Sequence, residues 1–340
     1  MIDAHFPLDL IAKRPPTLWR YEEALPALPI EDRVSFQEGF TPLLPYQVGK
    51  TQVFLKLDYL FPTGSYKDRG ATMIISHAQK LGVTSVVQDS SGNAGCAIAC
   101  YAAKAGIACK IFVPADTSPA KIVQISMYGA EVVRIQGNRD ATAAACMDFA
   151  QKNEVYYASH VHNNLFLEGT KTFAYEVCEQ LGWQAPDALV LPAGNGTLLL
   201  GAYMGFQDLL KTGIIVQMPK LIGVQAQNCA PLYAEWAGEP IPDCQTPTMA
   251  EGIAIAKPYL ASQMIEAVRQ TQGSFITVGE ADIKKQVVYL ARQGYYVEPT
   301  SACIIAGLEQ YVATQSKTAV IVSVLTGIGL KATDKLAYLV

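Results

Sequence analysis

Short runs of β-branched and other apolar residues alternate with longer alanine- and leucine-rich runs along most of the 340-residue chain. The short runs have the length of buried strands, and the long runs have the length of helices. The strand candidates are residues 53–57, 84–88, 108–113, 131–135, 155–158, 188–191, 220–225 and 319–324. The helix candidates are residues 66–81, 93–105, 118–128, 138–152, 168–181, 197–211, 280–293 and 301–314. This alternation predicts an α/β fold with parallel sheets covered by helices on both faces.

The alternation is long enough for two sheets, which predicts two α/β domains with a cleft between them as the natural ligand site. We expect residues 51–165 to form a smaller, mobile domain. Residues 1–50 and 166–340 would form the larger one. The first fifty residues are proline-rich and irregular, and residues 226–278 are interpreted as a large connection packed over the sheet.

Composition narrows the class of protein. Half of the residues are hydrophobic and 16% are charged, which suits a well-buried α/β enzyme. The net charge of −4 gives no general attraction to nucleic acid or to an anionic membrane. The longest uncharged apolar stretch, Ala94 to Ala103, is too short to cross a bilayer. Asp3, His5 and Asp9 precede any apolar run, so no signal peptide is expected.

The eight cysteines are scattered without a CxxC pair, and we interpret them as reduced thiols of a cytoplasmic protein. His160 and His162 alternate on an extended segment and would face the same way. No acidic or cysteine partner lies at a zinc-like spacing from them, so no metal site is predicted.

Lys67 is the first candidate for chemistry. It lies in Pro62-Thr-Gly-Ser-Tyr-Lys-Asp-Arg-Gly-Ala71, between a strand-like run and a helix-like run. A desolvated lysine loses its proton more easily, and a neutral amine forms a Schiff base with an aldehyde. An isolated lysine here would simply be a solvated residue at a helix start. Further glycine-rich segments downstream supply what a phosphorylated aldehyde cofactor needs.

Three of these segments each follow an apolar strand candidate. Asp89-Ser-Ser-Gly-Asn-Ala-Gly95 opens a helix and would bind a carboxylate, or it is a plain helix cap. Leu191-Pro-Ala-Gly-Asn-Gly-Thr-Leu198 would let the backbone approach a phosphate, or it is a tight turn. In Val322-Ser-Val-Leu-Thr-Gly-Ile-Gly-Leu-Lys331, the hydroxyl of Ser323 or Thr326 would face a ring nitrogen, or it caps a helix.

Together the segments resemble the tryptophan-synthase-β fold family of pyridoxal-phosphate enzymes, and within it the threonine-synthase branch. The matching pieces occur in family order and span nearly the whole chain. They are Leu18-Trp-Arg-Tyr-Glu22, Pro62-Thr-Gly-Ser-Tyr-Lys-Asp-Arg-Gly70, Ser90-Ser-Gly-Asn93, Glu168-Gly-Thr-Lys-Thr172, Pro192-Ala-Gly-Asn-Gly196, Val297-Glu-Pro-Thr-Ser-Ala302 and Leu325-Thr-Gly-Ile-Gly-Leu-Lys331.

The resemblance implies a role for each matching position. Lys67 would hold pyridoxal 5′-phosphate through a Schiff base and move the substrate's Cα proton, next to the family's aromatic position at Tyr66. Asn93 would bond the cofactor's 3′ oxygen, and Thr326 would face its pyridine nitrogen. A hydroxyl partner leaves that nitrogen largely unprotonated, which favours elimination over transamination. The cofactor phosphate would be cradled by Gly194, Asn195, Gly196, Thr197 and Leu198. The substrate carboxylate would be bound by Ser90, Ser91, Gly92 and Ala94.

The chain departs from threonine synthases where they bind the phosphate of O-phosphohomoserine. Aligned on Glu168-Gly169, the family's arginine position is Phe166, and its Asn-Ser pair is His160-Val161. A phosphate dianion favours a bidentate guanidinium, which phenylalanine does not supply. A second family arginine is also replaced, since Ala250-Glu-Gly-Ile-Ala254 resembles the corresponding segment of serine/threonine dehydratases. Ile328 stands where threonine synthases usually have a histidine.

This departure predicts a changed substrate. His160, His162 and Phe166 would then line the substrate pocket, with the histidines binding a different leaving group or helping a proton transfer. The alternative is that the histidines only pack and that Lys171 or Lys257 binds the phosphate.

The sequence thus predicts a cytoplasmic pyridoxal-phosphate lyase that catalyses elimination or replacement at Cβ or Cγ of a small L-amino acid. True threonine synthase, a serine/threonine dehydratase and a non-catalytic pyridoxal-phosphate-binding protein are the alternatives. The resemblance implies a homodimer.

Overall fold

The computed structural model describes residues 4–117 and 119–339. The chain divides into two compact units. The first unit comprises Met1–Gly39 and Phe61–Thr170, and the second comprises Phe40–Leu60 and Lys171–Val340.

The first unit is built on a four-stranded parallel sheet in the order β5-β4-β3-β6. Its strands are β3 (Ser85–Gln88), β4 (Ala108–Pro114), β5 (Glu131–Ile135) and β6 (Tyr156–Tyr157). Its helices are α1 (Leu8–Ile11), α2 (Asp68–Lys80), α3 (Asn93–Ala105), α4 (Pro119–Met127), α5 (Arg139–Lys152) and α6 (Leu165–Thr170). Two 3₁₀ helices, Leu18–Ala24 and Ile30–Asp32, lie in its N-terminal segment.

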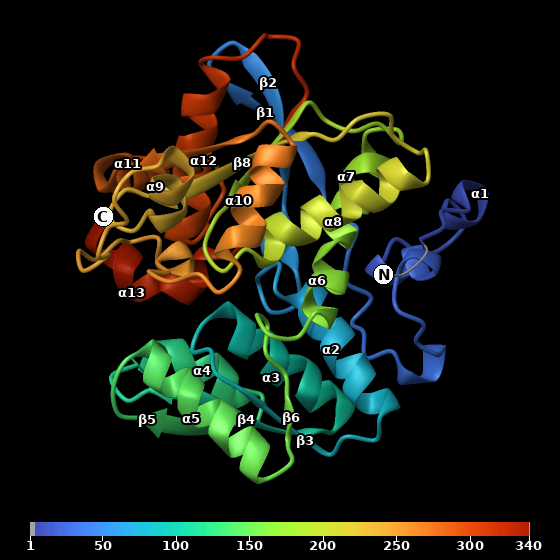
Figure 1. Cartoon of the computed structure of the whole chain (residues 1–340), viewed down its shortest axis with the longest axis vertical. Helices are drawn as coiled ribbons and strands as arrows, with labels where there is room; N and C mark the ends of the chain where they lie inside the picture. The colour runs from blue at the N-terminus through green and yellow to red at the C-terminus, as the bar shows by residue number, and fades with distance from the viewer. Residues whose placement is uncertain (1–3, 118, 340) are drawn as a thin grey trace. The chain divides into compact units, whose positions relative to one another are not determined.

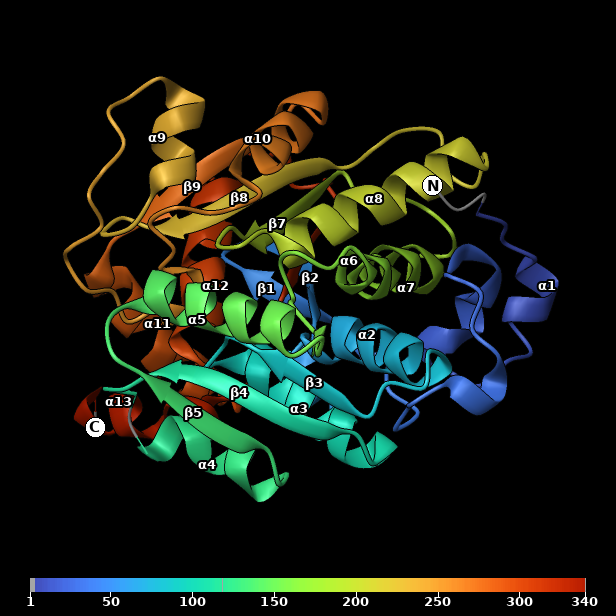
Figure 2. The ribbon, with the colours of Figure 1, turned by 60° about the horizontal axis from the view of Figure 1, so that its bottom comes forward.

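Helices cover both faces of this sheet, as Figure 2 shows for α5 on one face and α3 with α4 on the other. Neighbouring residues of β3 point to opposite faces, because side chains alternate along a strand. Val86 joins a buried cluster with residues of α2 and α3, whereas Val87 packs with Phe112 and Cys146 beneath α5. The middle of β3 is therefore buried on both sides, as expected of a strand in a parallel sheet.

The N-terminal segment packs on α2. The hydroxyl of Thr72 donates to the carbonyl of Val34 at 2.7 Å, and the N–H of Val34 donates to Ser76 Oγ at 2.8 Å. Leu18 and Trp19 bury themselves with Met73 of the same helix. The described residues 4–39 thus belong to the first unit, whereas the sequence analysis expected residues 1–50 in the larger domain. Whether residues 51–165 move as one body remains a prediction.

The second unit contains a six-stranded sheet in the order β1-β2-β10-β7-β8-β9. Its strands are β1 (Leu43–Val48), β2 (Thr51–Lys56), β7 (Ala188–Pro192), β8 (Lys220–Ala226), β9 (Ser274–Val278) and β10 (Ile321–Val324). β1 pairs antiparallel with β2 across the two-residue turn Gly49–Lys50, and the other pairs are parallel.

The second unit carries seven α-helices in its described part, and Figure 1 shows them by label. They are α7 (Thr172–Gln180), α8 (Thr197–Lys211), α9 (Pro231–Ala237), α10 (Ala261–Gln270), α11 (Glu280–Arg292), α12 (Pro299–Val312) and α13 (Thr333–Leu336). The 3₁₀ helices are Asp58–Leu60, Glu251–Ile253, Gly329–Ala332 and Ala337–Leu339.

A buried ion pair ties β2 to α7 within the second unit. Lys56 Nζ lies 2.7 Å from Glu176 Oε2, and both side chains are fully buried. The ammonium also donates to the carbonyl of Thr41 at 2.6 Å and to Gln180 Oε1 at 2.7 Å. All three ammonium protons thus have an acceptor, as a buried charge requires.

Most predicted elements are present, and the exceptions have physical causes. β1 was not predicted, because Pro45 interrupts its pattern; β1 is an edge strand, where proline is tolerated. β9, α9 and α10 lie in residues 226–278, which the sequence analysis interpreted as a connection. The single helix predicted over 168–181 is two helices, α6 and α7, which Lys171 separates.

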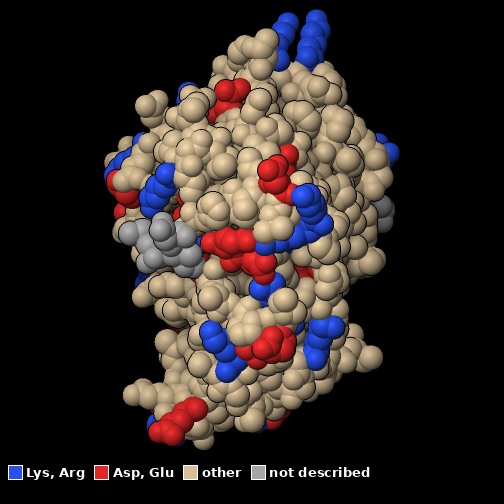
Figure 3. All heavy atoms as spheres, turned by 90° about the vertical axis from the view of Figure 1, so that its right-hand side faces the viewer, with Lys and Arg blue, Asp and Glu red and all other residues tan. Residues whose placement is uncertain are grey.

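On the face shown in Figure 3, basic and acidic side chains are interspersed and do not form one patch of a single sign. None of the helices in residues 4–117 and 119–339 combines the length and apolar composition needed to cross a bilayer.

Candidate active site

Lys67 stands immediately before α2, at the end of a tightly fixed turn in the first unit. The Asp68 carboxylate accepts hydrogen bonds from the Thr63 N–H at 2.8 Å and from the Thr63 hydroxyl. Gly64, between them, has φ +77°, a conformation that favours glycine. These hydrogen bonds fix the conformation of the turn, and they thereby fix the position of the Lys67 backbone. The Lys67 side chain is half-buried.

Two aromatic rings flank the Lys67 ammonium. Its Nζ lies 4.8 Å from the centroid of the Tyr66 ring and 5.5 Å from that of the Phe166 ring. Phe166 is fully buried, and a Cβ at Gly70 would lie 2.4 Å from its ring. Only glycine at position 70 therefore lets this ring pack on the first turn of α2.

His160 lies beside Phe166, and its hydrogen bonds favour one tautomer of the imidazole. The ring centroids are 6.0 Å apart, and His160 is 4% exposed. Gln88 Oε1 accepts from the Asp89 N–H, which orients the amide so that its Nε2 donates to His160 Nδ1 at 3.2 Å. Nδ1 is then an acceptor, so the proton of the neutral imidazole is on Nε2.

The surroundings of His160 keep it neutral. Burial lowers the pKa of His160 well below its usual range, and the positive charges of Lys67, Arg139 and His162 lower it further. The side chain is thus a neutral hydrogen-bond donor near the candidate lysine, and it is not a cation at neutral pH.

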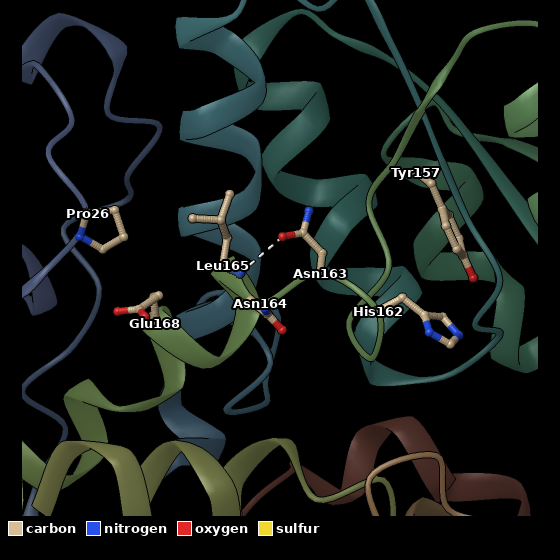
Figure 4. A pocket seen from close by; sticks show the side chains of 7 residues that line it. All are labelled: Pro26, Tyr157, His162, Asn163, Asn164, Leu165 and Glu168. Carbon is tan, nitrogen blue, oxygen red and sulfur yellow. Dashed lines mark hydrogen bonds between the residues drawn. The ribbon is translucent and has the colours of Figure 1, made fainter. Parts of the chain in front are cut away.

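His162 lines a hollow of about 610 Å³ in the first unit. Figure 4 shows the rings of His162 and Tyr157 at one end of it, and Pro26 and Glu168 at the other. Asn163 Oδ1 accepts from the N–H of Leu165 at 3.0 Å, which fixes the start of α6. His160 and His162 therefore do not share one role, because the first is buried and the second borders a hollow.

The loop before α3 has the form of an anion site. Ser90 is buried, and its hydroxyl accepts from the Gly92 N–H at 3.3 Å. Gly92 is the N-cap of this 13-residue helix and provides no capping side chain. A Cβ at Gly95 would lie 1.8 Å from the Ser90 carbonyl oxygen, so the loop folds tightly on the helix. Ser91, Asn93 and Ala94 complete the predicted set at the same helix start.

The loop before α8, in the second unit, has a similar local form. Gly196, with φ +82°, is the N-cap of this 15-residue helix, again without a capping side chain. A Cβ at Gly196 would lie 2.5 Å from Met264 Sδ, and one at Gly194 would lie 3.0 Å from Ile253 Cα. The first N–H groups of a helix have no acceptor within it and attract an anion. Asn195, Thr197 and Leu198 lie in the same turn.

Thr326 follows β10 in the second unit and is 1% exposed. Its hydroxyl lies 3.1 Å from Ser301 Oγ and donates to Glu298 Oε1 at 3.1 Å. Ser301 and Glu298 are not among the site residues expected from the sequence. Their place in Val297-Glu-Pro-Thr-Ser-Ala302, one of the matching pieces, was the signal that pointed to them.

The two lysines considered as phosphate ligands have different surroundings. Lys171 is 2% exposed, and its ammonium lies 3.1 Å from the Asp208 carboxylate. Lys257 is exposed at the surface of the second unit. Within the described residues, no cluster of three or more histidine, cysteine, aspartate or glutamate side chains has the arrangement of a metal site.

A family model described as pyridoxal-phosphate dependent enzyme matches residues 34–327. The chain belongs to this family, and its cofactor is pyridoxal 5′-phosphate. Among its relatives, the threonine synthase of Methanocaldococcus jannaschii is 34% identical over 336 residues, 95% of this chain and 83% of the relative. The threonine synthase of Synechocystis sp. is 37% identical over 329 residues, 93% of this chain and 84% of the relative. The resemblance to the threonine-synthase branch is thereby confirmed.

Solved structures bear out the fold. Threonine deaminase isoform 2 from Solanum lycopersicum aligns with a TM-score of 0.77 at 21% identity, covering 96% of this chain and 90% of that one. A fungal L-serine ammonia-lyase from Rhizomucor miehei aligns with a TM-score of 0.76 at 23% identity, covering 88% and 96%. The predicted α/β fold of the tryptophan-synthase-β type is confirmed.

The residues present fit this cofactor chemically. The uncapped start of α8 suits a phosphate group. The half-buried amine of Lys67 suits an aldehyde, and the buried hydroxyl of Thr326 suits a ring nitrogen.

Proposed function

We propose that this enzyme catalyses elimination or replacement at Cβ or Cγ of a small L-amino acid whose leaving group is not a phosphate dianion. Lys67 is the residue to which the cofactor's aldehyde attaches, and it also moves the Cα proton. Bound pyridoxal phosphate would supply the electron sink that lets bonds at Cα break. Every other part of the proposal concerns what the protein's own side chains do.

The remaining roles follow the chemistry of each group. The turn from Gly194 to Leu198 holds the cofactor phosphate, because α8 starts there without a capping side chain. Tyr66 lies against the lysine, and Asn93 bonds the 3′ oxygen. The loop from Ser90 to Ala94 binds the substrate carboxylate at the start of α3. Thr326 faces the ring nitrogen.

The main support for a leaving group other than phosphate is the burial of Phe166. The family's arginine position holds a fully buried ring packed on Gly70, which supplies no charge for a phosphate. His160, at the family's asparagine position, is a neutral donor. Losing the charged hydrogen bonds of a guanidinium costs on the order of 2–4 kcal/mol of binding. These two positions favour an uncharged or singly charged leaving group, such as a hydroxyl or an acyl ester.

A true threonine synthase is the second candidate, because the relatives at 34–37% identity over most of the chain carry that name. In that case another cation binds the phosphate. Lys171 is a poor choice, because its ammonium already pairs with Asp208. A serine/threonine dehydratase also remains open, since Ala250-Glu-Gly-Ile-Ala254 resembles that branch.

The test compares substrates on the purified holoenzyme. O-Phospho-L-homoserine, O-acetyl-L-homoserine, L-serine and L-threonine are supplied in turn, and released phosphate, acetate, keto acid and threonine are quantified. The proposal expects the highest kcat/KM with a substrate that lacks a phosphate. Phosphate and threonine released in equal amounts, at the highest kcat/KM of the set, would refute it and establish a threonine synthase.

Exchanging the two divergent residues sharpens the test. His160→Asn combined with Phe166→Arg should raise kcat/KM for O-phosphohomoserine by roughly 30- to 1,000-fold, the equivalent of 2–4 kcal/mol. Phe173→Leu, a change at another fully buried phenylalanine, controls for general loss of packing. An unchanged substrate ratio in the double variant would count against the role of Phe166.

A further inference from the structure

A hollow of about 400 Å³ lies at the amino ends of three strands in the second unit. Ala188, Lys220 and Ile321 line it, and they are the first residues of β7, β8 and β10. Because these strands are parallel, their amino ends meet at one edge of the sheet. The loops proposed to hold the cofactor follow the carboxyl ends of β7 and β10. The length of β7 therefore separates the hollow from those loops, by about 15 Å.

Two helices of the second unit end at this hollow. α10 ends at Gln270, and Gln270, Thr271 and Gln272 line one part of the wall. α12 ends at Val312, and Tyr311 from its last turn lines another part. The last carbonyl groups of a helix carry a partial negative charge. Both helix ends thus favour a positively charged group in the hollow.

A carboxylate and a buried hydroxyl line the same hollow. Asp187 directly precedes β7, and its Oδ2 accepts from the Val320 N–H at 2.7 Å, which fixes the side chain. Tyr311 is 9% exposed, and within the described part of the chain its hydroxyl makes no hydrogen bond. Burial raises the pKa of Tyr311, and the charge of Asp187 raises it further, so the hydroxyl keeps its proton. A buried hydroxyl of this kind is available to a ligand.

Two opposite charges border the hollow. Among the described residues that line it, Asp187 is the only acidic residue and Lys220 is the only basic one. Lys220 lies opposite Ala188 in the register of β7 and β8, so the two charges are on neighbouring strands. A simple cation is repelled by Lys220, and a simple anion is repelled by Asp187 and by the helix ends. A small molecule that carries both charges is attracted by all of these groups.

The rest of the wall is uncharged and leaves room for a small side chain. It includes apolar side chains and side-chain amides, among them Met218, Ala319, Ile321, Gln217 and Gln315. The volume of about 400 Å³ lies within the range of small-molecule sites, roughly 300–1,000 Å³.

We infer that this hollow is a second binding site, which takes a free α-amino acid with a small uncharged side chain. The ammonium group binds the Asp187 carboxylate and a lone pair of the Tyr311 hydroxyl. The carboxylate binds Lys220, and the side chain lies on the apolar part of the wall. The inference goes beyond the proposed function, because the site lies at the opposite ends of β7 and β10 from the cofactor loops.

The probe for this site is ¹⁴C-labelled L-2-aminobutyrate, which has no leaving group at Cβ or Cγ. Binding is measured by equilibrium dialysis on the borohydride-reduced holoenzyme, in which the cofactor no longer exchanges with the amine of the probe. We expect a saturable component whose Kd rises at least about tenfold in Asp187→Asn and in Lys220→Met, because each loses a charged hydrogen bond. Asp282→Asn and Lys285→Met make the same changes at exposed positions of α11 and should leave Kd unchanged.

Analogues of the probe test each charge from the side of the ligand. N-acetyl-L-2-aminobutyrate lacks the ammonium group, and L-2-aminobutanamide lacks the carboxylate. Each should compete at least about tenfold less well than L-2-aminobutyrate. Tyr311→Phe keeps the packing of the ring and should weaken binding by about 2- to 10-fold, which tests the site even if a charge variant does not fold.

Two results would overturn the inference. The first is the lack of any saturable binding at millimolar concentrations of the probe. The second is binding that Asp187→Asn, Lys220→Met and Tyr311→Phe all leave unchanged, which would place the probe at the active site. Preferred turnover of O-phosphohomoserine would refute the proposed leaving group and would not change the binding measured at Asp187 and Lys220, so the two failures are distinguishable.

Discussion

The ring of Phe166 lies directly on the backbone of Gly70, so that a methyl group at position 70 would come within 2.4 Å of the ring atoms. Gly70 is the third residue of α2, and Lys67 immediately precedes that helix. The same ring lies 5.5 Å from the Lys67 ammonium. One close contact thus links the packing of the first unit to the surroundings of the candidate catalytic lysine.

Gly70→Ala should destabilise the protein, although alanine is normally the better helix former by about 1 kcal/mol. Overpacking against Phe166 should outweigh that gain and cost about 1–3 kcal/mol. Urea unfolding measures the difference, and Gly279→Ala is the control, because its Cβ would only make an ordinary contact with Gln227. Phe166→Leu should restore stability in the Gly70→Ala background. Equal stability of Gly70→Ala and wild type would contradict the close contact.

Lys56→Met should be far more destabilising than the loss of a surface lysine. It leaves the carboxylate of Glu176 buried without its cation, which typically costs about 3–5 kcal/mol. Lys152→Met breaks an exposed i,i+4 pair with Asp148 and should cost about 0.3–0.5 kcal/mol. Both are measured by chemical denaturation, and Lys56→Met with Glu176→Leu should recover much of the loss. A cost below that of Lys152→Met would show that the pair is not buried.

The neutral state of His160 predicts a pH dependence of stability. Unfolded histidine titrates near pH 6.5, whereas burial and the charges of Lys67, Arg139 and His162 place the folded pKa lower. Above pH 6.5 both states are neutral, and this residue adds no pH dependence. Below it the unfolded state binds a proton that the folded state does not. The free energy of unfolding should therefore decrease as the pH is lowered below 6.5. The decrease is up to about 1.4 kcal/mol per pH unit and ends where the pH reaches the folded pKa.

Unfolding curves between pH 5 and 7.5 check this, and His160→Gln should flatten the slope below pH 6.5. His77→Gln is the comparison, because burial and then the charge of Lys80 also lower the pKa of that half-buried histidine. We expect His77→Gln to flatten the slope less. The same slope in His160→Gln as in wild type would mean that folding does not lower the pKa of His160.

Lys67→Ala should abolish covalent attachment of the cofactor. Reduction of the wild-type holoenzyme with borohydride, followed by peptide mass spectrometry, should find the label on the peptide that contains Lys67. Activity of Lys67→Ala should fall by at least about 10²–10⁴-fold, because a positioned proton-transfer group is also lost. Lys104→Ala, near the end of α3, should keep both label and activity. Label on another lysine would remove Lys67 from its proposed role.

Much of the fold could be predicted from the sequence, because the periodicity of apolar residues over short stretches distinguishes strands from helices. The parallel sheets were predictable from uninterrupted apolar runs such as Val86-Val87, whose side chains pack on opposite faces. β1 was not predicted, because Pro45 is unfavourable in a central strand. Only the sheet order shows that β1 is an edge strand. The break at Lys171 between α6 and α7 was also not predicted, since the sequence there has the pattern of one continuous helix.

By itself, the sequence determined the α/β class, the family and its cofactor, since ordered motifs need no coordinates to be recognised. It also determined that the positions corresponding to the phosphate-binding arginine and asparagine are Phe166 and His160. Only the tertiary structure decided what those residues are: a ring buried on Gly70, and an imidazole kept neutral by Gln88 and by burial. It alone joined Glu298, Ser301 and Thr326 into one hydrogen-bonded chain. Protonation states and hydrogen-bond directions depend on which distant residues meet in space, and a pattern of neighbours along the chain does not contain that information.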